Sequence, residues 1–183
     1  DLTSVPYKTL ITDAEISIVK TYSTILNSEV SWSRYNVRDV YVHDDRYQLT
    51  GSGTNFNVYS GHLKNLQVAI KLAKEAEDNN AIAVAQILKA YAFQNMTDWY
   101  GDIPYSEALR ADDSENATIY PKYDSQQSIY MDIIAQLKAA NAMINTAESM
   151  GNADVIFDGD MMMWKKFTNS LLLRVYMRMS LVD

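Results

Sequence analysis

Two adjacent residues near the middle of the chain, Asp98 and Trp99, have the chemistry of a sugar-binding site. The apolar face of an indole can stack on the C–H groups of a sugar ring, while a neighbouring carboxylate accepts hydrogen bonds from its hydroxyl groups. Tyr100 follows directly, and Trp32 lies where an irregular stretch begins, a setting in which exposed aromatic residues are informative. We take Trp99, Asp98, Tyr100 and Trp32 as candidate ligand-binding residues. The alternative is that these aromatic residues are buried in the core, as many tryptophans are.

The same segment continues into the sequence Tyr-Gly-Asp-Ile-Pro, which is typical of a turn with one required shape. Gly101 permits a tight exit from a helix, and Pro104 biases the residue before it towards an extended conformation. Asp102 can accept hydrogen bonds from the backbone of the turn. We therefore predict a structural role for Gly101, Asp102 and Pro104. The alternative is direct contact with a ligand or a partner.

A second group of acidic side chains surrounds two glycines in a loop nearer the C-terminal end of the sequence. Asp154, Asp158 and Asp160 could ligate calcium, which prefers carboxylate oxygens. Their spacing does not match an EF-hand loop, because no glutamate stands at the closing position. We favour the alternative, in which Asp158 or Asp160 caps the helix that follows. No other metal or cofactor is expected.

The overall composition argues against several functional classes. The chain has 183 residues and a net charge of −7, which disfavours nucleic-acid binding because phosphates require Lys and Arg. It has no cysteine, which excludes disulfides, thiolate zinc sites and a cysteine nucleophile. His43 and His62 stand in no metal-ligand pattern, and we expect each to be on the surface or hydrogen-bonded. No stretch reaches the roughly 18–20 apolar residues that cross a bilayer.

The positions of the apolar residues predict an all-α fold. Residues 81–96 are apolar on almost every side, which is typical of a helix buried within a domain. Spacings of three and four residues predict further helices over 12–26, 63–73, 124–144 and 164–179. We expect Asn79 to end one helix, Asn80 to begin the next, and Asp124 to cap the third.

The helices within residues 63–96 form a hairpin of the length found in tetratricopeptide repeats, about 34 residues. We predict tetratricopeptide-like hairpins packed in an irregular right-handed array, within one helical domain over residues 1–183. Residues 1–60 are expected to be less regular, and residues 61–183 to form the helical core. Because the last predicted helix is strongly apolar up to the end of the sequence, we expect the chain to be the first part of a longer protein.

Three motifs occur in an order that is typical of one protein family. In the first, residues 85–109, an apolar helix leads into Tyr-Gly-Asp-Ile-Pro and then Ser-Glu-Ala. The second is 121–126, with Ile-Tyr following, and the third is 159–178, where Gly-Asp precedes a Trp-Lys-Lys-Phe-Thr-Asn-Ser-Leu segment and two apolar-Arg pairs. These motifs resemble the SusD/RagB family. The resemblance covers about residues 60–183; the first sixty residues match loosely, and the C-terminal half of the family is missing.

The resemblance implies a cell-surface protein of the outer membrane, facing outward and held by a lipid anchor outside this sequence. Such a protein caps a TonB-dependent porin-like transporter, captures oligosaccharides and passes them on for import, without catalysis. For this part of the protein we expect mainly a scaffold that docks on the transporter. Two alternatives stay open: a peptide-binding member of the same family, or a protein-interaction scaffold alone. A glycosidase would need two paired carboxylates, and no pair is marked by its context.

Overall fold

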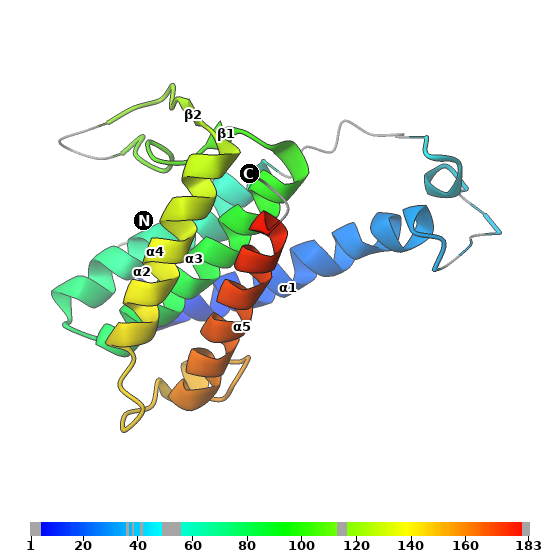
Figure 1. Cartoon of the computed structure of the whole chain (residues 1–183). Coiled ribbons are helices and arrows are strands. Elements are labelled where there is room, and N and C mark those ends of the chain that lie inside the picture. The colour runs from blue at the N-terminus through cyan, green and yellow to red at the C-terminus, as the bar shows by residue number, and fades with distance from the viewer. Residues whose placement is uncertain are drawn as a thin grey trace.

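Five α-helices make up most of the part of the chain that this computed structural model describes, which is residues 5–35, 37, 39–40, 42–48, 56–112 and 117–180. They are α1 (Tyr7–Trp32), α2 (Lys64–Glu75), α3 (Asn79–Tyr100), α4 (Gln126–Met143) and α5 (Met161–Met179). Three short helical turns, η2 (Asp44–Arg46), η3 (Tyr59–Leu63) and η4 (Gly151–Ala153), lie between them. The strands β1 (Ile103–Pro104) and β2 (Tyr123–Asp124) form one small antiparallel pair. The predicted all-α class is confirmed (Figure 1).

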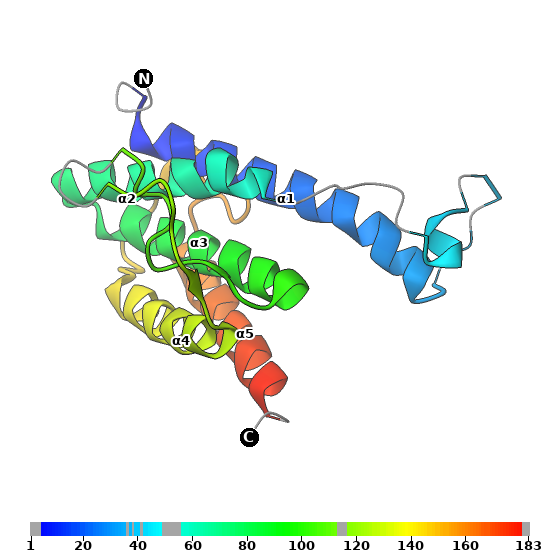
Figure 2. The ribbon, with the colours of Figure 1, turned by 90° about the horizontal axis from the view of Figure 1, so that it is seen from above.

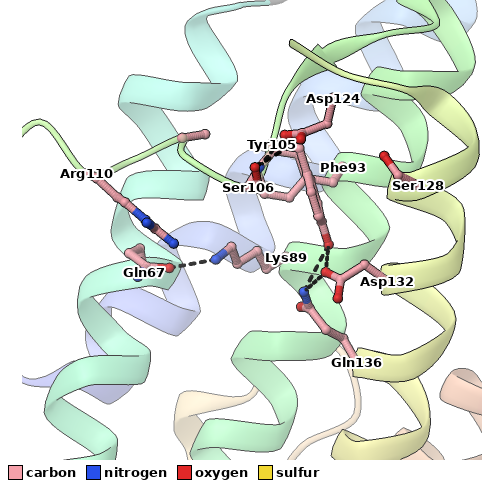
Figure 3. Close-up of a pocket in the computed structure, with 11 residues that line it drawn as sticks. Gln67, Lys89, Phe93, Tyr105, Ser106, Arg110, Asp124, Ser128, Asp132 and Gln136 are labelled. Carbon is pink, nitrogen blue, oxygen red and sulfur yellow. Dashed lines mark hydrogen bonds between the residues drawn. The ribbon is translucent and has the colours of Figure 1, made fainter. Parts of the chain in front are cut away.

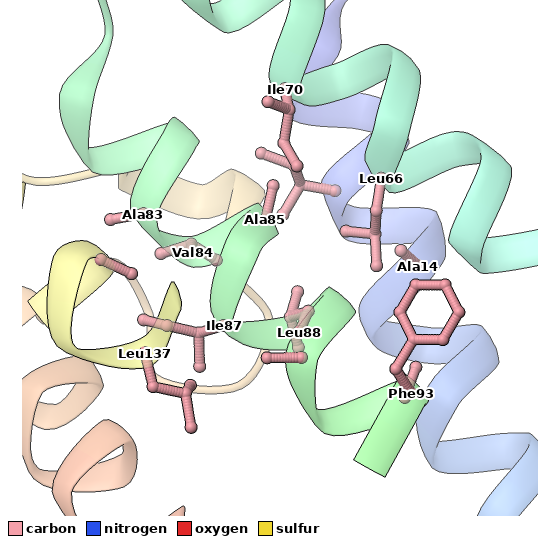
Figure 4. Packing of buried hydrophobic residues seen from close by; sticks show 14 of the residues in the cluster. Ala14, Leu66, Ile70, Ala83, Val84, Ala85, Ile87, Leu88, Phe93 and Leu137 are labelled. Atoms are coloured by element: carbon pink, nitrogen blue, oxygen red, sulfur yellow. The ribbon is translucent and has the colours of Figure 1, made fainter. Parts of the chain in front are cut away.

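Helix α3 lies at the centre of the molecule. Viewed from above, α1 and α2 lie on one side of it, and α4 and α5 lie on the other (Figure 2). Of its 22 residues, 14 are buried, as expected for a helix that is apolar on almost every side. Small side chains on α3 let the neighbouring helices approach closely. These are Ala81, Ala83, Ala85, Ala90 and Ala92. Leu66 and Ile70 of α2 and Leu137 of α4 pack around this helix (Figure 4).

Helix α1 is longer than the sequence pattern predicted. It begins after Pro6, whose fixed φ suits the first turn of a helix, and it buries Leu10, Ile11, Ala14 and Ile18 against the core. Its C-terminal half extends beyond the other helices, and η2 lies near its far end (Figures 1 and 2). None of the described helices combines the length and the hydropathy that a membrane span requires.

The junction between α2 and α3 differs from the prediction by one or two residues. Glu77, with φ of 55°, adopts the left-handed conformation that was expected at Asn79. Asp78 then caps α3 by accepting a hydrogen bond from the N–H of Ala81 at 3.0 Å. Asn80 is instead buried, where its amide donates to the carbonyl of Asn145 at 2.9 Å and accepts from the N–H of the same residue. The predicted caps were wrong because the buried position of Asn80 depends on a loop far along the chain.

The starts of α4 and α5 depend on short polar side chains. Ser125 caps α4 by accepting from the N–H of Ser128, so the prediction of Asp124 as the cap was wrong. Asp124 belongs to β2, and its carboxylate accepts from the N–H of Ser106 at 2.7 Å. Asp160 caps α5 by accepting from two backbone N–H groups, as one of the two alternatives for this loop predicted.

The two histidines differ in environment. His43 is exposed, and its Nδ1 lies 3.4 Å from the side-chain oxygen of Gln48. His62 is 3% exposed, and its Nε2 has no hydrogen-bond partner among the described residues. The expectation that His62 is on the surface or satisfied was therefore wrong. Burial lowers the pKa of His62 to about 4, although nearby Asp13 opposes this change, so the ring is neutral at ordinary pH.

A buried acid joins α1 to the loop before α5. Glu15 is fully buried, and its Oε2 accepts a hydrogen bond from the N–H of Val155 at 2.8 Å. Its Oε1 has no partner among the described residues. Burial raises the pKa of Glu15 to about 8, and the nearby carboxylate of Asp154 contributes to the rise. Glu15 is therefore mostly protonated at neutral pH.

This environment predicts a loss of stability at alkaline pH. The folded-state pKa of Glu15 is about 8 and its ordinary value is 4.5, so folding binds a proton between these values and stability falls as pH rises through them. Between about pH 7 and pH 9 the wild-type protein should lose roughly 1 kcal/mol through this group. Glu15→Gln imitates the protonated acid and should remove this part of the loss. Urea unfolding at a series of pH values measures the difference, and an equally steep decline in the variant would contradict the assignment.

Candidate functional site

The segment that follows α3 is held in one shape by hydrogen bonds. Gly101 ends the helix with φ of 72°, and its N–H donates to the carbonyl of Thr97 at 2.8 Å. The hydroxyl of Thr97 donates in turn to the carbonyl of Gly101 at 2.6 Å. A positive φ of this size is accessible to glycine and is strained for other residues. The chain can therefore reverse immediately after Tyr100, and Ile103 and Pro104 then form β1.

Asp102 and Pro104 connect this turn to the neighbouring elements. The Oδ1 of Asp102 accepts from the N–H of Gln126 at 2.9 Å, at the first residue of α4. The side chain of Gln126 donates to the carbonyl of Thr97 at 2.6 Å. The carbonyl of Pro104 accepts from the hydroxyl of Tyr59 in η3 at 2.6 Å. The turn thus fixes where the last residues of α3 stand relative to α4 and η3.

Two of the candidate ligand-binding residues, Trp32 and Trp99, lie together although they are far apart in the sequence. Trp32 ends α1 and Trp99 lies in the last turn of α3, and their ring centroids are 5.9 Å apart with a tilt of 51°. Trp99 is 37% exposed, and Trp32 is half-buried. Tyr100 is also 37% exposed, and its ring centroid lies 5.3 Å from that of Phe56. The C-terminal ends of two helices therefore present an accessible aromatic surface, which we call the aromatic pair, Trp32 and Trp99.

The third candidate, Asp98, has a different environment from its neighbour Trp99. Its side chain is 9% exposed and accepts a hydrogen bond from the hydroxyl of Tyr130 on α4. Its Oδ2 lies 3.1 Å from the Nε of Arg178 on α5 and also accepts from the side chain of Gln94. Burial raises the pKa of Asp98, although Tyr130 and Arg178 oppose this change. The carboxylate is thus occupied in joining α3, α4 and α5.

Further aromatic residues follow α1. The hydroxyl of Tyr47 donates to the carbonyl of Trp32 at 2.8 Å, and the guanidinium of Arg34 lies 5.4 Å from the ring centroid of Tyr47. Tyr35 is strongly exposed. These contacts place additional exposed rings close to the end of α1 that carries Trp32.

The acidic loop before α5 is organised by hydrogen bonds to N–H groups. Asp154 is buried, its Oδ1 accepts from the backbone of Ile156 and Phe157, and its Oδ2 accepts from the backbone of Gly159 and the indole of Trp164. Asp160 caps α5. Within the described ranges, no three His, Asp or Glu side chains are grouped as metal ligands. The carboxylate oxygens of Asp154 and Asp160, which the calcium alternative would use as ligands, instead accept hydrogen bonds that shape the loop and begin α5. Asp158 adopts a positive φ of 53°.

A polar cavity of about 450 Å³ lies between α2, α3, α4 and the segment after β1 (Figure 3). Sequence reasoning did not identify it, because its walls come from four separate parts of the chain. Lys89, Arg110, Tyr105 and Asp132 are among its lining residues. One signal was present in the sequence: Lys89 is the single charged residue of the mostly apolar 81–93 segment of α3. A charge in such a position requires either a partner or access to solvent.

Comparison with known proteins identifies the chain. It matches a protein-family model described as SusD-like, starch-binding and associating with the outer membrane, over residues 1–183. The chain belongs to the SusD-like family. The match includes the first sixty residues, which resemble the family motifs only loosely. No match was found among curated protein sequences.

Solved structures support the same assignment. A chitin-binding protein is 38% identical, with a TM-score of 0.59 over 69% of this chain and 26% of its own length. A SusD homologue from Bacteroides fragilis is 30% identical, with a TM-score of 0.66 over 78% of this chain and 29% of its own. A SusD/RagB family protein from Bacteroides thetaiotaomicron is 26% identical, with a TM-score of 0.77 over 96% of this chain and 38% of its own. The predicted tetratricopeptide-like, SusD-like fold is confirmed, and the chain spans well under half the length of these three proteins.

The turn after α3 yields a prediction about its glycine. Gly101→Ala should destabilise the protein by roughly 1–3 kcal/mol, because a side chain is strained at this φ. No neighbouring atom lies within 4 Å of the added Cβ, so backbone strain alone causes the loss. Lys166→Ala is the control, since Lys166 is exposed within α5 and an alanine there takes ordinary helical φ and ψ. Urea unfolding of both variants measures the effect; equal losses at the two positions would show that φ is not the cause.

Proposed function

We propose that the chain is the helical part of a cell-surface protein that binds oligosaccharides for nutrient uptake, and that the aromatic pair is part of its ligand site. The family description names starch binding and the outer membrane, and one related structure is a chitin-binding protein. The observation that carries the proposal is the contact between Trp32 and Trp99, in which Trp99 stays 37% exposed. A large aromatic side chain that stays half-exposed at the ends of two helices gains little from the core, which favours a role in binding.

The geometry of the pair suits an extended glycan. Two indole rings tilted by 51° offer two apolar faces in different directions, and each can cover the C–H face of one sugar residue. Tyr100 adds a half-exposed ring next to Trp99. Because Asp98 is occupied by Tyr130 and Arg178, hydrogen bonds to sugar hydroxyl groups come from other residues of the complete protein.

The rest of the described chain fits the role of a scaffold. The helices share one core around α3, and the outward face of α5 exposes Leu173, Tyr176 and Met177. In our proposal the helical core docks the protein on a TonB-dependent porin-like transporter. A lipid anchor outside this sequence holds the protein on the outward face of the outer membrane. The protein acts by binding and delivery, without catalysis, since its most buried carboxylates serve the fold.

One observation keeps the peptide-binding alternative open. An aromatic surface with an acidic overall charge also suits peptides that carry lysine or arginine, because cations stack on indole faces. The ligand panel that tests the proposal therefore includes peptides as well as glycans.

Substitution of the aromatic pair tests the proposed function. Calorimetry of the complete protein with chito-oligosaccharides, malto-oligosaccharides and short basic peptides identifies the ligand. Trp99→Ala and Trp32→Ala should each weaken glycan binding by about tenfold or more, because each removes one stacking face. Tyr176→Ala is the matched control, since Tyr176 is an exposed aromatic residue on α5 and its loss should leave binding unchanged.

Two results would contradict the proposal. Glycan affinity that survives both tryptophan substitutions would move the site to another part of the protein. Binding of peptides in place of glycans would assign the protein to the peptide-binding alternative. Circular dichroism of each variant shows whether the helices are intact, so a folding defect is separated from the loss of a contact.

A further inference from the structure

The polar cavity between α2, α3 and α4 has the properties of a second binding site. Its volume of about 450 Å³ lies within the range of roughly 300–1,000 Å³ that is usual for small-molecule pockets. Its floor is apolar, formed by the ring of Phe93, which meets Tyr105 edge-on at 4.7 Å between centroids. Charged and hydroxyl groups project into it from two opposite sides (Figure 3).

One side of the cavity carries two cations. The Nζ of Lys89 donates to the side-chain oxygen of Gln67 at 2.6 Å, and no carboxylate of the described residues lies within 4 Å of it. The guanidinium of Arg110 is directed towards Lys89 and Gln67 (Figure 3) and has no carboxylate partner in the described part of the chain. Asp132 attracts Lys89 only from beyond ion-pair distance, and the second cation, Arg110, adds repulsion. An anion placed between the two cations would offset this repulsion.

The electrostatics of Lys89 agree with this description. Burial lowers its pKa to about 8, Asp132 opposes the change, and Arg110 and Lys74 add to it. Lys89 is therefore mostly charged at neutral pH, but it loses its proton at a lower pH than an ordinary lysine does. A bound anion would stabilise the charged form.

The opposite side of the cavity carries hydrogen-bonding groups in a fixed arrangement. The hydroxyl of Tyr105 donates to the Oδ2 of Asp132 at 2.6 Å, and the side chain of Gln136 donates to the same oxygen at 2.5 Å and to Tyr105 at 2.9 Å. The other oxygen of Asp132 accepts no hydrogen bond from the described residues, so it can accept one from a ligand hydroxyl. Ser106 and Ser128 line the same cavity.

We propose that this cavity binds a sugar acid, such as a hexuronic acid, whose carboxylate lies between Lys89 and Arg110 and whose hydroxyl groups donate to Asp132. The two sides require these two chemistries at once: an anion for the paired cations and a hydroxyl donor for the free carboxylate oxygen. An apolar floor suits the C–H face of a sugar ring. The site is separate from the aromatic pair and does not depend on its role.

Titration calorimetry of the complete protein with D-glucuronate, with D-glucose as the neutral match, tests the proposal. Glucuronate should bind measurably and glucose at least about tenfold more weakly, since a charge-assisted contact is lost. Lys89→Met keeps the apolar stem and removes the charge, and it should weaken glucuronate binding by about tenfold. Lys71→Met is the matched control on the exposed surface of α2 and should bind as the wild type does.

The remaining outcomes decide against the site. Equal binding of glucose and glucuronate, no binding of glucuronate, or full binding by Lys89→Met would each overturn it. A tripeptide with a free C-terminus offers the same carboxylate without the sugar, and preference for the tripeptide would overturn the assignment to sugar acids. If Lys89→Met does not fold, Arg110→Gln at the exposed end of the cavity makes the same test. Trp99→Ala should leave glucuronate binding intact, which separates this site from the proposed function.

Discussion

The burial of α3 is the constraint on which the other elements depend. A helix that is apolar on almost every side must be covered all round, and here four helices cover it. Its alanines bring α2 and α4 close, so the backbone positions of the neighbours are set by short side chains rather than long ones. Polar residues on such a helix can be accommodated only near its ends or at the edges between neighbours. Asp98 lies near the C-terminal end of α3, and Lys89 lies at the edge between α2 and α4. Asp98 therefore contacts α4 and α5, and Lys89 borders the cavity.

The polar groups within the core divide into those that serve the fold and those that stay available. Asp98 joins three helices through Tyr130 and Arg178. Asp154 satisfies three backbone N–H groups and the indole of Trp164, so it orders the loop that leads into α5. A buried carboxylate with its hydrogen bonds filled has little capacity for a ligand. The groups that we propose for binding, the aromatic pair and the residues that line the cavity around Lys89, remain at least partly accessible.

Much of the fold was predictable from the spacing of apolar residues. The four helices from α2 to α5 were found because each has a buried stripe or is buried all round, and that signal is local. The caps were less predictable, because Asn80 and Asp124 make hydrogen bonds to segments distant in the sequence. The identities of two aromatic candidates, Trp32 and Trp99, came from residue type alone. Their contact was not predictable, since it depends on the length of α1, which continues beyond the periodic part of its sequence. The orientation of the Asp98 side chain was not predictable either, because its partners Tyr130 and Arg178 lie on α4 and α5.

The two proposed sites are physically separate, although each includes a residue of α3. Ten residues along a helix correspond to about 15 Å of rise, so Lys89 and Trp99 are far apart along the axis. At about 100° per residue they also differ in direction around the axis by roughly 80°. A rigid helix fixes this offset, and a change at one residue has no short path to the other. In the two proposals, stacking at the end of α3 therefore selects a flat C–H face, and the charged groups on the side of α3 select a carboxylate.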